Sequence, residues 1–99
     1  MTEAILAPTP EEKNYRVVEK TYQWVRDPDG CLDDDLVESF VSERVVWEAR
    51  QKFSPGRSYL GERGVVFLPK SEAMLGATNY DYWLERQLET GQWSFLAVL

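Results

Sequence analysis

The amino-acid sequence predicts an α+β fold, a small two-layer sandwich in which an antiparallel sheet carries two helices on one face. Two segments have apolar residues at helical spacing, and each is preceded by residues that suit a helix N-terminus. The segments around them are rich in β-branched and aromatic residues, which favour strands. The elements therefore follow the order β-α-β-β-α-β.

The first thirteen residues are expected to form a flexible arm, and residues 14–99 a single α+β domain. The arm contains Ala7-Pro8-Thr9-Pro10, and Thr9 together with Glu12 matches a capping box that can start a helical turn. A chain of 99 residues suffices for one domain that buries about 60–65% of its unfolded surface.

Residues 15–26 fit both a strand and a helix. In a helix, four apolar or aromatic residues would share one face, namely Tyr15, Val18, Tyr22 and Val25. The segment is nevertheless dominated by residue types that fit a pleated sheet. A strand is therefore favoured, and the helix stays open as the alternative.

A turn is predicted at Asp27-Pro-Asp-Gly30, because proline and glycine occupy the positions that a type I turn prefers. The acids at 33–35 suit the positive end of a helix, which is predicted over about 33–43 and is followed by a strand from Val45. The alternative is one helix as far as Phe53. It rests on residues that recur at every fourth position: Val37, Val41, Val45, Ala49 and Phe53.

Three short elements are predicted between residues 54 and 78. Ser54-Pro-Gly56 forms a turn, and Val65-Val-Phe-Leu68 forms a strand that Pro69 ends. Ser71 is a suitable cap for a single helical turn through Leu75.

The clearest pattern covers residues 79–99. Asn79 is a good N-cap, and a helix follows whose apolar stripe consists of Tyr80, Trp83, Leu84 and Leu88. Gly91 suits the left-handed position at the end of that helix. The run from Trp93 to Leu99 is short, aromatic and apolar, so it is predicted to be a strand.

This element order is that of a ferredoxin-like domain, in which the last strand lies at a sheet edge. A strand with two apolar faces is a liability at an edge unless something covers it. The simplest cover is a second copy of the chain across a two-fold axis. The alternative is that this strand is central and the element order is wrong.

The net charge of −6 lies entirely in the first half of the chain. Residues 1–50 hold twelve acids and six bases, whereas residues 51–99 hold five of each. Such a chain is a poor partner for nucleic-acid phosphates or for anionic membranes, because both need clustered lysine and arginine. There is one cysteine, and there is neither a long apolar run nor a signal-peptide pattern, so a cytoplasmic location is expected.

The residue types restrict the available chemistry. The absence of histidine excludes Ser-His-Asp and Cys-His catalysis and histidine-ligated metals. Cys31 lies among acids that disfavour its thiolate. The acids at 27, 29 and 33–35 could bind calcium or magnesium, but in an EF-hand register Val25 and Leu36 would occupy ligand positions. We therefore predict no catalytic residue, no cofactor and no metal site.

The expected function is that of a small, acidic, non-catalytic binding or regulatory protein, either a homodimer or a minor subunit of a complex. Its acid-rich segment 27–48 would steer it towards a basic partner surface. One alternative is a small ligand-binding domain or enzyme with a pocket lined by Arg50, Arg57, Arg63 and tyrosines. Another is a mimic of nucleic acid. The candidate partner-binding residues are Asp33, Asp34, Asp35, Arg57, Arg63, Tyr82, Trp93 and Phe95.

Overall fold

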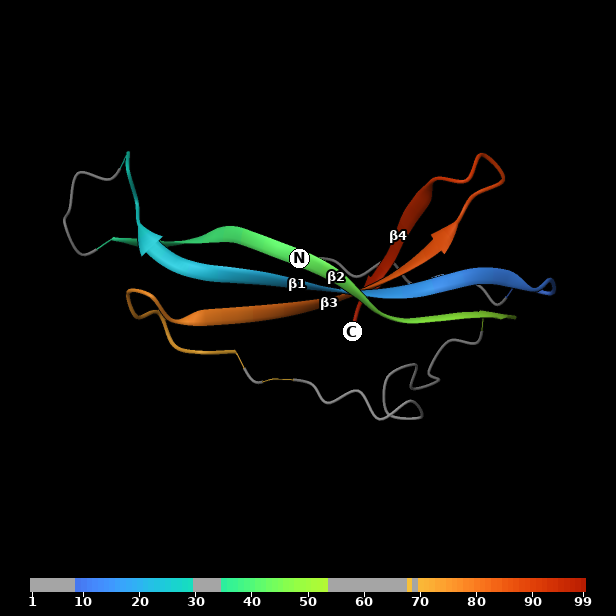
Figure 1. Ribbon diagram of the computed structural model, residues 1–99, viewed down its shortest axis with the longest axis horizontal. Coiled ribbons are helices and arrows are strands. Elements are labelled where there is room, and N and C mark those ends of the chain that lie inside the picture. Colours follow the sequence, from blue (N-terminus) through green and yellow to red (C-terminus); the bar gives the residue numbers. More distant parts are fainter. Residues whose placement is uncertain (1–8, 30–34, 54–67, 69) are drawn as a thin grey trace.

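The computed structural model describes residues 9–29, 35–53, 68 and 70–99, and in these ranges the chain is all β. Its elements are β1 (Lys13–Arg26), β2 (Leu36–Gln51), β3 (Thr78–Gln87) and β4 (Trp93–Val98). They form one antiparallel sheet with the strand order β2-β1-β3-β4 (Figure 1). The predicted α+β class and its ferredoxin-like order are therefore wrong, since the described ranges contain no helix.

The segment predicted as the C-terminal helix is the strand β3. Asn79 is the second residue of this strand and not a helix cap. Tyr82 and Leu84 are buried on one face, whereas Leu88 lies beyond the strand and is exposed. The apolar residues of this segment were interpreted as a helical stripe because they do not alternate strictly with polar residues. The alternation is weak because both faces of β3 are partly covered. The prediction of a strand after Gly91 is confirmed by β4.

Within the described residues, the segment predicted as the first helix forms the first half of the strand β2. The second half of β2 confirms the strand predicted from Val45, so the alternative of one helix to Phe53 is wrong. Two β-bulges interrupt the pairing of β2 with β1, where Val46 and Val41 are the extra residues. The strand interpretation of residues 15–26 is confirmed, because β1 pairs with both β2 and β3 over most of its length. The turn predicted at 54–56 and residues 65–67 of the predicted strand lie outside the described residues.

The turn between β1 and β2 is described as far as Asp29, and Pro28 and Asp29 adopt a turn as predicted. The backbone N–H of Asp29 donates to Oδ1 of Asp27, and the N–H of Asp27 donates to the carbonyl of Asp35. Asp35 therefore helps to close a β-hairpin instead of starting a helix.

The predicted turns at Thr9 and Ser71 are not helical. Thr9 Oγ1 accepts a hydrogen bond from the N–H of Phe53 and lies 3.0 Å from the Tyr15 hydroxyl, so it ties the N-terminal arm to the end of β2. Ser71 contacts the buried side chain of Asn79 through its backbone N–H and its hydroxyl. Asn79 also donates to Glu38 on β2, so this amide connects three segments of the chain.

The β3–β4 hairpin closes with a three-residue loop. The N–H of Leu88 donates to the carbonyl of Gln92, and the N–H of Gly91 donates to the carbonyl of Leu88. Gly91 has φ +88°, the left-handed position that such loops require. The sequence therefore correctly places glycine in this conformation, but in a hairpin and not at a helix end.

Replacing Gly91 with alanine is expected to lower the free energy of unfolding by ~1 kcal/mol. A Cβ atom at this position meets no atom within 4 Å, so the loss would come from the backbone conformation alone. Gly91→Asn should lose less, because asparagine tolerates this conformation better. Urea denaturation measures both, and equal stability of wild type and Gly91→Ala would contradict the loop geometry.

The hydrophobic core occupies one end of the sheet. Its buried cluster comprises Tyr15, Val17, Trp47, Phe53, Tyr82, Leu84 and Leu96. All of these residues lie at the end of the sheet that contains β4 and the C-terminal end of β2. At the opposite end, near the β1–β2 turn, the described sheet has three strands and its outer residues are exposed (Figure 1).

Candidate functional site

The candidate partner-binding residues that the structure describes do not form one cluster. Asp33, Asp34, Arg57 and Arg63 lie outside the described residues. Asp35 is exposed just before β2, and Tyr82 is buried in the core with 3% of its surface exposed. Tyr82 is therefore a core residue in the free chain.

Trp93 and Phe95 share a face of the sheet, but their rings are engaged within the chain. The guanidinium of Arg16 lies 4.3 Å from the centre of the Trp93 ring. Phe95 packs edge-on against Trp83, with the centres of the two rings 4.8 Å apart. Tyr82 lies on the other face, because neighbouring residues of β3 alternate. The structure therefore does not bring these three aromatic residues together, although β4 does lie at a sheet edge.

A buried polar cluster lies on the core face. Glu19 is 7% exposed and accepts a hydrogen bond of 2.8 Å from the Tyr82 hydroxyl. Its other oxygen accepts one of 2.9 Å from Nε of Arg44 on β2. Burial, reinforced by the hydrogen bond to Glu19, raises the pKa of Tyr82 to about 12. The cluster joins β1, β2 and β3, and its groups are engaged with one another.

The opposite face carries a network of cations and aromatic rings. The Lys20 ammonium lies 3.6 Å from the centre of the Trp83 ring. Arg16 donates to Glu85 at 2.8 Å, and the Lys70 ammonium lies 3.0 Å from Asp81. The hydrogen bond to Asp81 raises the pKa of Lys70. These acids are neutralised locally and do not form the row that a mimic of nucleic acid would need.

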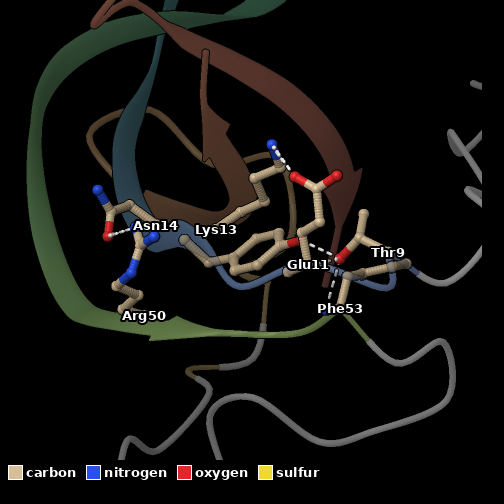
Figure 2. Close-up of polar contacts among 7 residues, drawn as sticks. Thr9, Glu11, Lys13, Asn14, Arg50 and Phe53 are labelled. Carbon is tan, nitrogen blue, oxygen red and sulfur yellow. Dashed lines mark hydrogen bonds and ion pairs between the residues drawn. The ribbon is translucent and has the colours of Figure 1, made fainter. Parts of the chain in front are cut away.

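A shallow cleft of about 370 Å³ lies at the end of the sheet where Arg50 and Trp93 are found. Figure 2 shows Arg50 donating to the Asn14 side chain. Asn14 in turn donates to Gln87 at 2.9 Å. Of the three arginines proposed for a ligand pocket, only Arg50 is described. The central amides of the cleft are thus already hydrogen-bonded to each other, which leaves the pocket hypothesis little support.

Several exposed apolar residues lie along β2, which is an edge strand of the described sheet. We call this surface the β2 edge. It comprises Val37, Phe40, Val41 and Val45, which are 38%, 52%, 56% and 43% exposed. One side of β2 pairs with β1, and the other side pairs with no strand in the described part of the chain. Phe40 and Val45 lie opposite Tyr22 and Val18 on one face of the sheet, whereas Val37 lies opposite Val25 on the other face. Exposed apolar residues along an unpaired edge are typical of interaction surfaces.

Sequence reasoning missed the residues that define these features. Glu19 occupies an inward position between Val17 and Thr21 on β1, where a carboxylate signals a buried partner. That alternation was available in the sequence, but the partners Tyr82 and Arg44 are brought close only by the strand pairing. Val37, Phe40 and Val41 were assigned to the apolar face of a helix, and Val45 to the strand after it.

The described residues contain no group of three or more acidic, cysteine or histidine side chains placed to hold a metal ion. They also contain no helix long and apolar enough to cross a membrane. Comparisons with protein-family models, with curated proteins and with solved structures found no match for this chain.

Proposed function

We propose that this chain is a non-catalytic protein-binding protein that acts through the β2 edge. The observation that carries the proposal is the set of four exposed apolar side chains on a strand with one free side in the described sheet. A partner that covers them would remove apolar surface from water and would shield the backbone groups along the edge.

The polar clusters support a binding role over a catalytic one. Glu19 is held by Tyr82 and Arg44, and Glu85 is held by Arg16. These contacts connect neighbouring strands, so they serve the stability of the sheet. With one cysteine and no histidine in the whole sequence, a cytoplasmic binding protein is the best-supported class.

The acids near the β2 edge would affect the rate of partner binding. Asp35, Glu38 and Glu43 lie on or beside the first half of β2 and are exposed. Negative charge around an apolar patch attracts a partner that carries positive charge at the matching positions. The proposal therefore includes an association rate that falls as the salt concentration rises.

The proposal predicts that Val41→Asp will strongly reduce partner capture. Immobilised chain would be exposed to an extract of its native host, and bound proteins would be quantified by mass spectrometry. A charge in the centre of a desolvated patch should reduce capture about tenfold or more. Circular dichroism would first establish that the variant is folded, since Val41 is exposed in the free chain.

The matched control is Leu88→Asp, which introduces the same charge at an exposed leucine in the β3–β4 loop. This control should capture the same proteins as the wild type. Equal capture by wild type and both variants would show that binding does not use the β2 edge, and would overturn the proposal.

A further inference from the structure

We infer that the partner of the β2 edge is a second copy of this chain, whose β2 lies antiparallel to the first across a two-fold axis. The inference rests on the proposed function, because it identifies the occupant of the surface described above. The sequence pattern predicts self-association through the last strand, which is β4. The pairing inferred here places self-association at β2 instead.

The distribution of charge along β2 is self-complementary. Residues 35–43 contain Asp35, Glu38 and Glu43 and no base, a formal charge of −3. Residues 44–52 contain the bases Arg44, Arg50 and Lys52 and one acid, Glu48, a formal charge of +2. Antiparallel pairing places the acidic half of each copy beside the basic half of the other, and a two-fold axis produces this match twice. Parallel pairing would place like charges together.

Several of these charges are both held in place and accessible. Arg44 donates to Glu19 and is 73% exposed, and Arg50 donates to Asn14 and is 61% exposed. Glu43 lies 4.0 Å from Lys20 and is 49% exposed. A charge whose position is already restricted loses less conformational entropy when a partner binds. The basic surface expected of a partner is therefore present on the chain itself.

The apolar residues of the edge flank the central charges Glu43 and Arg44. Phe40, Val41 and Val45 all lie within four residues of the middle of β2, so a two-fold pairing about that middle brings apolar residues of both copies close together. The bulges at Val41 and Val46 restrict regular backbone pairing to short stretches. Side-chain burial and charge pairing would therefore supply most of the binding free energy of this interface. We expect the association to be reversible and to weaken as the salt concentration rises.

The first test is the mass of the wild-type chain in solution, measured by sedimentation velocity over a range of concentrations. A monomer–dimer equilibrium is expected, with an apparent Kd that rises about tenfold or more between ~50 mM and ~500 mM NaCl. A chain that remains monomeric at ~1 mM protein in ~50 mM NaCl overturns the inference.

The second test exchanges the charges of each half separately. Asp35→Lys with Glu43→Lys gives both halves, 35–43 and 44–52, a net positive charge, whereas Arg50→Glu with Lys52→Glu gives both halves a net negative charge. All four positions are exposed, so both variants should fold. Each variant alone should be monomeric, and an equimolar mixture should form a one-to-one heterodimer. A mixture that fails to associate contradicts the antiparallel arrangement.

The matched control is Glu72→Lys with Glu89→Lys, which makes the same change of charge at exposed positions outside β2. It should dimerise like the wild type, and loss of dimerisation here would overturn the assignment to β2. A monomeric chain that still captures another protein through Val41 overturns the second-copy partner but not the binding role. A chain that does neither overturns both proposals.

Discussion

Replacing Leu84 with alanine is expected to lower the free energy of unfolding by ~2–5 kcal/mol. Leu84 is 1% exposed and belongs to the single buried cluster of the described residues. Truncation removes apolar surface and leaves a cavity between neighbours that the β-sheet backbone holds apart. Urea denaturation at neutral pH, monitored by tryptophan fluorescence, measures the loss.

Leu88→Ala is the matched control, and its expected loss is below ~1 kcal/mol. Leu88 is 40% exposed and lies in the β3–β4 loop. In the helix that the sequence pattern favours, Leu84 and Leu88 would lie one turn apart on the same buried stripe. Similar losses for the two variants would therefore support that helix and contradict β3.

Spacing of four residues explains why a helix as far as Phe53 was a credible alternative to the strand from Val45. Residues at every fourth position, such as Val37, Val41 and Val45, share a helix face, but four is also an even number, so they share a strand face too. The bulges then move later residues to the other face. Val45 lies opposite Val18, whereas Trp47 lies opposite Val17. The pattern is thus helical in appearance although every residue is in a strand.

The elements that could be predicted were those with a local signal. β4 is short, aromatic and apolar, and Gly91 precedes it in a conformation that few other residues adopt. The proline–aspartate turn after β1 is equally local. β3 lacked such a signal, because Asn79 is a good helix cap and also a good hydrogen-bonding side chain. Only the positions of Ser71 and Glu38 decide which role it takes.

The candidate site was less predictable than the strands. A strand lies at a sheet edge when no other strand pairs with one of its sides. This depends on the arrangement of the whole sheet, so no local sequence pattern predicts it. Likewise, Glu19 and Tyr82 are 63 residues apart in sequence, and only the pairing of β1 with β3 places them together. The charge asymmetry of β2 was visible, but it acquires meaning only when residues 35–52 lie along one extended edge.

Tyr82→Phe is expected to lower the free energy of unfolding by ~1.5–3 kcal/mol at neutral pH. The substitution keeps the ring in the core but removes the hydroxyl that donates to the buried carboxylate of Glu19. A buried acceptor without its donor retains the cost of leaving water. Tyr80→Phe is the control. The Tyr80 hydroxyl makes no hydrogen bond with the described residues, so its removal should change stability by less than ~1 kcal/mol.

The pH dependence of this difference identifies the hydroxyl as the cause. In the unfolded chain Tyr82 loses its proton near pH 10, whereas in the folded chain its pKa is about 12. Above pH 10 the unfolded state is therefore favoured, and the stability supplied by the neutral hydroxyl is lost as the pH rises towards 12. Between pH 9 and 11 the wild type should lose ~1 kcal/mol that the Phe variant does not lose. Other groups titrate alike in both proteins, so a difference that stays constant with pH would show that Tyr82 is not the donor to Glu19.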